Sequence, residues 1–367
     1  MNTNLLHQVA LTLVPNIGPV QAKILIDHFG DPSSIFKAKK SSLEALEGIG
    51  GIRARNIKEF TGYKRAEEEL AFIDKYKIIP LFLTDPAYPR RLLNCYDPPT
   101  LLYYRGNTNF NAAKTVAIVG TRSKTEYGKH LTEKLVADLK EAQVLIISGL
   151  ALGIDAVAHK AALKHAVPTV AVVAHGLDKI YPAEHTVLAK DILKENGSVL
   201  TEFMSRTKPD KHNFPSRNRI VAGMSDAVVV VETDLKGGSM ITAELANGYN
   251  RDVFAFPGRT TDNKSAGCNY LVKNNKAILL TGAQDIIDIL GWSDKKTAPK
   301  KQQKELFITL STEEKLIVDL LKEKELVPID ELRAKSNLNS STVAAAILNL
   351  ELQNVVLSLP GKLYRLL

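Results

Sequence analysis

Residues 144–163 read Val-Leu-Ile-Ile-Ser-Gly-Leu-Ala-Leu-Gly-Ile-Asp-Ala-Val-Ala-His-Lys-Ala-Ala-Leu, and this stretch decides the fold. Its first four residues form an apolar run typical of a strand that is buried on both faces. Ser148, Gly149 and Gly153 interrupt the run, and the Ala-rich residues after them have helical spacing. A strand that enters a helix through such a turn presents backbone N–H groups at the positive end of the helix dipole. The turn suits a phosphate, although a tight connection that binds nothing would have the same pattern.

The same alternation of strand and helix runs through residues 114–290. Strands are predicted at 115–119, 144–147, 169–174, 198–201, 227–231, 252–256 and 277–280. Helices are predicted at 127–141, 154–162, 217–224, 239–249 and 283–290. Alternating β and α segments predict an α/β fold with a mainly parallel sheet and helices on both of its faces.

Ligands of such sheets bind beyond the carboxyl ends of the strands. The predicted strands are followed there by small residues, hydroxyls and a cation: Gly120, Thr121, Arg122, Ser148, Gly149, Gly176, Gly237, Gly238 and Ser239. Since these loops converge on one rim, we expect an anion-binding site. Neither the dinucleotide-binding glycine motif nor the P-loop motif is present, so the sequence predicts no nucleotide cofactor.

A second cationic motif is Phe-Pro-Ser-Arg-Asn-Arg at residues 214–219, which places Arg217, Asn218 and Arg219 near a helix start. Guanidinium groups match the geometry of phosphate, and we expect at least one of the two arginines to face a ligand. The alternative is that they brace the fold by pairing with carboxylates such as Glu202, Asp226 or Glu232.

Composition sets wider limits. The 367 residues carry a formal net charge of +8, which permits an anionic partner such as nucleic acid but is also found in metabolic enzymes. Cys95 and Cys268 are too few for a disulfide framework or a cysteine zinc site, and the histidines are scattered. No signal peptide and no apolar run of the ~18 residues that a membrane span needs is visible. A reducing cytoplasm is the predicted location.

Residues 1–62 contain two similar units, Val-Pro-Asn-Ile-Gly-Pro at 14–19 and Leu-Glu-Gly-Ile-Gly-Gly at 46–51, each between helical segments. This pattern is similar to a doubled helix-hairpin-helix, or SAM-like, module. Hairpin amides of that module can bind a backbone phosphate, and a helical bundle that contacts other proteins remains the equal alternative. Arg53, Arg55 and Lys58 favour phosphate. Residues 63–113 are predicted to be a connector whose short strands extend the sheet at its edge.

The C-terminal part begins with a lysine-rich stretch, 291–307, that is predicted to be a flexible linker. Residues 308–367 then contain three predicted helices and a small hairpin, the pattern of a winged helix. The third helix of that fold enters the major groove in DNA readers. Here the exposed positions of that helix lack Lys and Arg, so both a DNA-binding and a protein-binding role stay open.

The motifs of the central domain resemble, in order, those of the bacterial DNA-processing protein A family, DprA or Smf. They are Val-Ala-Ile-Val-Gly-Thr-Arg at 116–122, Ser-Gly-Leu-Ala-Leu-Gly-Ile-Asp at 148–155, Phe-Pro-Ser-Arg-Asn-Arg-Ile-Val-Ala-Gly at 214–223, and Gly-Ser-Met-Ile-Thr-Ala at 238–243. The resemblance implies an extended Rossmann-like domain that binds single-stranded DNA, commonly as a homodimer, and loads RecA recombinase during natural transformation. It makes Arg122 the best DNA-contact candidate, with Gly149, Gly176, Arg217 and Gly238 lining the same pocket.

The predicted function is therefore a single-stranded DNA-binding protein that mediates RecA loading and is not an enzyme. The alternative is a nucleotide-processing enzyme, because Gly-Gly-Ser-Met-Ile-Thr at 237–242 with Glu244 is similar to the signature of phosphoribohydrolases. A scaffold whose terminal modules recruit partners is a third hypothesis.

Overall fold

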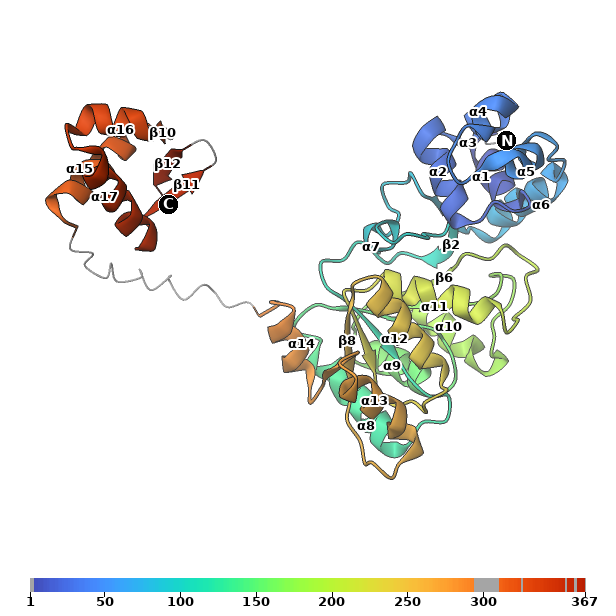
Figure 1. Cartoon of the computed structure of the whole chain (residues 1–367). Coiled ribbons are helices and arrows are strands. Elements are labelled where there is room, and N and C mark those ends of the chain that lie inside the picture. The colour runs from blue at the N-terminus through green and yellow to red at the C-terminus, as the bar shows by residue number, and fades with distance from the viewer. Residues whose placement is uncertain (1–2, 294–309, 325, 354, 360–361, 367) are drawn as a thin grey trace. The chain divides into compact units, whose positions relative to one another are not determined.

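The computed structural model describes residues 3–293, 310–324, 326–353, 355–359 and 362–366. The chain divides into two compact units, Met1–Ser293 and Asp294–Leu367 (Figure 1). Most of the predicted linker, residues 294–307, lies outside the described residues. None of the helices in the described ranges combines the length and the apolar composition that a membrane span requires.

A nine-stranded sheet forms the centre of the first unit. Its strands are β1 (Ile79–Phe82), β2 (Leu101–Gly106), β3 (Thr115–Val119), β4 (Leu145–Ser148), β5 (Thr169–Val172), β6 (Ser198–Thr201), β7 (Ala227–Val230), β8 (Asp252–Ala255) and β9 (Ile278–Leu279). They lie in the order β1-β2-β6-β5-β4-β3-β7-β8-β9. All pairs from β6 to β9 are parallel, whereas β1 and β2 are antiparallel. The predicted mainly parallel α/β sheet, extended at its edge by the connector, is confirmed.

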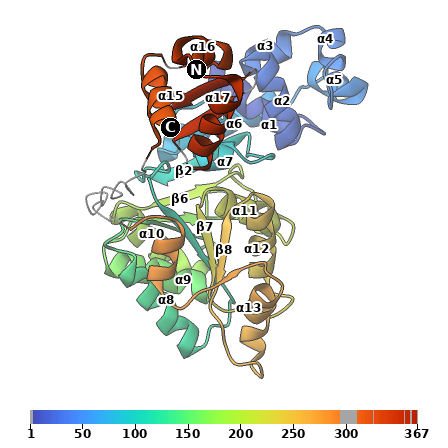
Figure 2. The same ribbon diagram turned by 60° about the vertical axis from the view of Figure 1, so that its left-hand side comes forward.

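Helices cover both faces of the sheet. One face packs against α8 (Glu126–Asp138), α9 (Ile154–Lys164) and α14 (Ala283–Ile289), and the other against α11 (Asn213–Gly223), α12 (Gly238–Gly248) and α13 (Asn263–Lys273). Successive residues of β3 point to opposite faces of the sheet. Val116 and Ile118 pack with the first group of helices, and Ala117 and Val119 pack with the second group. Figure 2 shows the two groups of helices on opposite sides of β7 and β8. Because both faces are covered, the strands are apolar throughout.

The observed helices differ from the predicted ones in two respects. Helix α11 begins at Asn213 rather than at 217, because Pro215 falls in its first turn, where the missing N–H has no partner to lose. Between residues 77 and 293, four elements were not predicted: α7 (Arg90–Leu93), the 3₁₀ turn η1 (Ala183–His185), α10 (Thr186–Lys194) and α13. Helix α13 contains Gly267 and Asn269, which are poor helix formers, and buries Cys268 and Leu271 against the sheet.

The N-terminal helices are α1 (Thr3–Leu13), α2 (Pro19–Phe29), α3 (Pro32–Lys37), α4 (Lys40–Glu44), α5 (Gly50–Lys58) and α6 (Tyr63–Tyr76). The two predicted hairpins join α1 to α2 and α4 to α5, as expected of the doubled module. Residues of this module, such as Leu11 and Leu25, belong to the same apolar cluster as Leu102 and Leu200 of the sheet. Residues 1–62 therefore share one continuous core with the α/β part of the chain.

The second unit has the predicted winged-helix fold. It consists of α15 (Thr312–Lys322), β10 (Val327–Pro328), α16 (Ile329–Ser336), α17 (Ser340–Leu352), β11 (Val356–Leu359) and β12 (Leu363–Leu366). The predicted capping box is present, since Glu314 N–H donates to Ser311 Oγ at 3.2 Å and Ser311 N–H donates to Glu314 Oε2 at 2.9 Å. Strand β10, which was not predicted, pairs with β12.

A buried histidine makes the first unit sensitive to acid. His159 of α9 is fully buried, and its Nδ1 lies 2.8 Å from Thr169 Oγ1. Because the Thr169 hydroxyl donates to Ile146 O, it accepts from Nδ1–H, and Nε2 is left without a partner. Burial, with the nearby His185 and Arg217, lowers the pKa of His159 to about 3.

We expect the fold to lose about 2 kcal/mol between pH 6.5 and pH 5 through His159 alone. Below pH 6.5 the His159 side chain takes up a proton in the unfolded chain but stays neutral in the folded chain. The contribution of His159 to the free energy of unfolding is therefore fully present above pH 6.5 and is lost as the pH falls. Urea unfolding of the wild type and of His159→Asn at both pH values measures the difference. Equal pH dependence in the two proteins would contradict the assignment.

Candidate nucleic-acid interface

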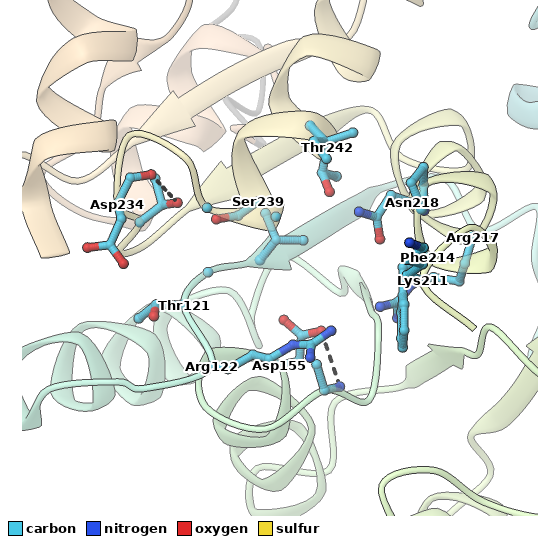
Figure 3. A pocket seen from close by; sticks show the side chains of 18 residues that line it. Thr121, Arg122, Asp155, Lys211, Phe214, Arg217, Asn218, Asp234, Ser239 and Thr242 are labelled. Atoms are coloured by element: carbon cyan, nitrogen blue, oxygen red, sulfur yellow. Dashed lines mark hydrogen bonds between the residues drawn. The ribbon is translucent and has the colours of Figure 1, made fainter. Parts of the chain in front are cut away.

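One cavity of the first unit lies where the chain reverses its direction across the sheet. From β3 the chain proceeds to β4, β5 and β6 on one side, and β7 and β8 lie on the other side of β3. Loops that leave β3 and β7 therefore diverge, and parallel sheets bind ligands in the crevice that results. The cavity there has a volume of about 330 Å³ (Figure 3).

Eight of the twelve predicted site residues line this cavity: Gly120, Thr121, Arg122, Arg217, Asn218, Gly237, Gly238 and Ser239. They come from the turn after β3, from α11 and from the first turn of α12. The structure thus brings together residues that lie more than a hundred positions apart in the chain. Their role as ligand contacts stays a prediction.

The start of α12 forms one wall. Gly237 caps the helix, and a Cβ atom at this position would lie 2.2 Å from Thr233 Oγ1, so only glycine fits. The Oγ of Ser239 is buried and has no hydrogen-bond partner within the described residues. The free N–H groups of this helix start and its dipole favour an anion.

Arg122 lies at the mouth of the cavity and is exposed. Its guanidinium carbon lies 5.0 Å from the centre of the Phe214 ring, a cation–π contact. Within the described residues no carboxylate pairs with Arg122, so its charge is available to a ligand.

An open groove of about 620 Å³ continues outward from Arg122. It is lined by further cations and aromatic rings: Lys179, Tyr181, Lys208, Lys211 and Phe214. The rings of Tyr181 and Phe214 lie 6.4 Å apart, and Tyr181 is 46% exposed. The sequence analysis missed the three lysines. A usable signal was present, because Lys179 and Lys211 lie two and three residues before these two rings.

Arg217 lines the cavity, but its guanidinium is engaged in contacts within the protein. Its Nη1 donates to Val172 O at 2.8 Å and to Gly149 O, and its charge faces Asp155. A Cβ at Gly149 would overlap this guanidinium, which explains the glycine. Burial raises the pKa of Asp155, and Arg217 opposes the rise.

The turn after β4 is therefore a tight connection, and its interpretation as a phosphate site is corrected. The N–H of Ala151 donates to Asp155 Oδ2 at 3.3 Å, and the N–H of Ile154 donates to Thr121 O at 3.2 Å. The N–H groups of Ala151 and Ile154 are thus bound within the chain and are not available to an anion.

Three further predicted site residues lie away from the cavity. Arg219 has a side chain only 10% exposed, pairs with Glu202 and donates to Asp97 O, as the bracing alternative described. Ser148 is buried and donates to Ile118 O at 2.7 Å. Gly176 packs against the Met204 carbonyl, where a Cβ would come within 2.5 Å. Their assignment as ligand contacts is corrected, because their polar groups are already paired or their space is filled.

The enzyme alternative rested on Glu244. This carboxylate is not among the residues that line the cavity, and its Oε1 lies 2.7 Å from Lys276 Nζ. The carboxylates that do line the cavity are engaged as well, since Asp155 faces Arg217 and Asp234 pairs with Lys264 at 3.1 Å. The geometry gives no support to hydrolysis of a nucleotide at this site.

The helix-hairpin-helix module uses its polar groups internally. The Gly18 N–H donates to Gln21 Oε1 at 3.2 Å, which closes the first hairpin. Arg53 donates to Asn16 O at 3.0 Å, and Lys58 donates to Phe36 O at 2.7 Å. These three residues are engaged within the module, whereas Arg55 is exposed, so both alternatives for this module stay open.

The third helix of the winged-helix unit has an apolar exposed side. In α17, Leu348 is 55% exposed and Leu352 is 74% exposed, and the helix contains no Lys or Arg. This surface favours a protein contact over a contact with the DNA backbone.

Models of known protein families match all three parts of the chain. The family model for DNA recombination-mediator protein A matches residues 80–291. The model for the DprA winged helix domain matches residues 299–362, and that for the SAM-like helix-hairpin-helix tandem matches residues 9–61.

Individual relatives agree with these matches. Protein Smf of Synechocystis is 33% identical over 99% of both chains, and DNA processing protein DprA of Streptococcus pneumoniae is 40% identical over 58% of this chain and 75% of that protein. The crystal structure of the S. pneumoniae protein matches with a TM-score of 0.65 and 30% identity, over 78% of this chain and 98% of that one.

A structure of DNA processing protein A from Helicobacter pylori, described for its single-stranded DNA binding mode, matches with a TM-score of 0.53 and 33% identity. It covers 58% of this chain and 95% of that one. With the family model matching more than half of the chain, and a relative aligned along its whole length, this chain belongs to the DNA recombination-mediator protein A family, which includes the proteins called DprA and Smf.

Proposed function

We propose that this protein binds single-stranded DNA in the groove around Arg122. One observation carries the proposal: an exposed, unpaired arginine lies at the mouth of a cavity and stacks on Phe214. The lysines 179, 208 and 211 extend the positive charge along the groove, and the H. pylori relative is described as a single-stranded DNA binder.

The groove has the two components that binding of a single strand requires. Cations and the free N–H groups of α12 hold the sugar–phosphate backbone, and the rings of Tyr181 and Phe214 offer surfaces on which bases stack. Stacking and phosphate contacts do not distinguish bases, so binding has little sequence preference.

We further propose that the bound strand is handed to RecA recombinase, in the cytoplasm and in the course of DNA uptake. The family model bears the description of a recombination mediator, which supports this role. A shallow groove that holds the backbone leaves part of the strand accessible to a second protein. In this proposal the protein acts by binding and carries out no chemical reaction.

Homodimer formation is proposed through the sheet edge at β9. This strand is the last in the described sheet order, and its two apolar side chains, Ile278 and Leu279, are 38% and 45% exposed. An exposed apolar edge strand offers unpaired backbone groups to a second copy of the same strand. Pairing there would leave the DNA groove open, because the groove lies at the carboxyl ends of central strands.

Replacing Arg122 by alanine should weaken binding of single-stranded DNA about tenfold at low salt, for all base compositions alike. The dependence of log K on log salt should flatten by the slope of about one phosphate contact, ~0.7 for a single strand. Anisotropy titrations with a labelled oligothymidylate and a labelled mixed sequence measure both quantities.

Arg105→Ala is the matched control, because Arg105 is exposed on β2, makes the same change in charge and lines none of the cavities described above. It should bind like the wild type. Superimposable curves for Arg122→Ala and the wild type across the salt series would overturn the assignment of the groove.

Leu279→Lys should convert a dimer into a monomer, since it places a charge in the proposed apolar contact. Sedimentation velocity over a concentration series measures the change. Leu348→Lys serves as the control and should remain dimeric, because Leu348 is also exposed, at 55%, but lies in the winged-helix unit. A wild type that is monomeric at micromolar concentration, or an unchanged dimer in Leu279→Lys, would exclude this edge.

A further inference from the structure

The loop between β6 and α11 supplies two of the cations of the groove. We call residues 205–213 the lysine loop, since it carries Lys208 and Lys211. Within residues 202–216, all of which the structure describes, Ser205 is the only buried residue. Apolar packing therefore does little to fix this loop, and its position depends on hydrogen bonds at its two ends.

The C-terminal end of the loop is attached to the sheet. The Asn213 side-chain amide donates to Lys208 O at 3.2 Å and to Ala174 O at 3.4 Å. This contact ties the last loop residue both to the loop itself and to the segment that follows β5.

The N-terminal end is held by two side chains of α6, the helix that follows the helix-hairpin-helix module. Glu69 accepts from Ser205 N–H at 2.9 Å with Oε1 and from Ser205 Oγ at 2.5 Å with Oε2. Arg65 Nη2 donates to Ser205 O at 2.7 Å and to Glu69 Oε2 at 2.8 Å. Every polar atom of Ser205 is thus bound by an ion pair that belongs to another part of the chain.

The next residue, Arg206, connects the loop to the segment on the other side of the groove. Arg206 has a left-handed backbone (φ 69°), and its N–H donates to Asp178 Oδ1 at 2.9 Å. Its guanidinium pairs with Glu68 of α6 at 2.8 Å, and Gly176 N–H donates to Thr207 O at 3.1 Å. Asp178 directly precedes Lys179, so the same contacts hold the segment that carries Lys179 and Tyr181.

We propose that helix α6 positions the DNA groove, with Glu69 as the positioning residue that holds the lysine loop over it. Glu69 itself does not touch the strand; it acts through Ser205. The inference rests on the proposed function of the groove, and it gives α6 a role in DNA binding that needs no contact between α6 and DNA.

The chemistry of the contact supports positioning over simple stabilisation. Glu69 is 1% exposed, and a buried carboxylate brings no stability beyond that of a well-packed apolar side chain of similar size. What an apolar side chain cannot do is bind the N–H and the hydroxyl of one chosen residue. The contact therefore specifies where the loop lies.

The test uses the full-length chain with Glu69→Ala and, as matched control, Glu67→Ala, which removes an exposed carboxylate from the same helix. We expect Glu69→Ala to bind a labelled oligothymidylate about fivefold more weakly at low salt, with the salt slope reduced by up to two phosphate contacts, ~1.4. The control should match the wild type. A merely destabilised protein would lose active fraction but keep the slope of the molecules that remain folded.

Hydrogen exchange without DNA gives a second readout. In Glu69→Ala the amides of 203–213 should exchange faster, while those of β3, β4 and β5 keep their protection. Ser205→Ala removes only the hydroxyl contact and should show a smaller change in the same direction, which keeps the test decisive if Glu69→Ala does not fold.

Wild-type affinity and slope in Glu69→Ala, or unchanged exchange in its lysine loop, would overturn the inference. Failure of the proposed function has a different signature, because the wild type itself would then not bind single-stranded DNA. The exchange experiment, which contains no DNA, would still show whether α6 holds the loop.

Discussion

The whole first unit depends on the reversal of the chain across β3. The chain runs outward from β3 through β4, β5 and β6, and it then returns to place β7 on the other side of β3. The loops that follow β3 and β7 therefore lead in opposite directions and leave an opening between them. The opening between them is the cavity at the carboxyl ends of the strands, and the helix start of α12 and the mouth residue Arg122 line it because of that topology.

Buried ion pairs then decide which charges remain for a ligand. Arg217 with Asp155, Arg219 with Glu202, and Arg65 with Glu69 each fix a loop near the cavity. An arginine that is taken out of water needs acceptors, and these three find them within the protein. Arg122 and the lysines of the groove lie on loops at the surface, and no ion pair within the described residues engages them, so their charges are free to bind a polyanion.

The three parts of the chain do not contribute equally to this site. The helix-hairpin-helix module shares its core with the sheet, and an internal hydrogen bond closes its first hairpin. Helix α6, which follows the module, holds the lysine loop. The winged-helix unit has a separate core and exposes apolar residues on α17. A motif that resembles a DNA-binding module can thus serve the architecture or another protein, because its polar groups are satisfied elsewhere.

The sequence by itself determined the α/β class, the positions of the main strands, the doubled hairpins, the capping box and the set of glycine turns at one rim. These features follow from local patterns: apolar runs, turn residues and the spacing of helix caps. Only the tertiary structure decided which motif residues face the cavity. Local patterns could not separate Arg122, in the turn after β3, from Arg219, in α11, because the difference is a carboxylate, Glu202, brought in from another strand end. Lys208 was missed for the same reason: its place in the groove depends on Glu69, more than a hundred residues away in the chain, and long-range contacts of this kind leave no local pattern.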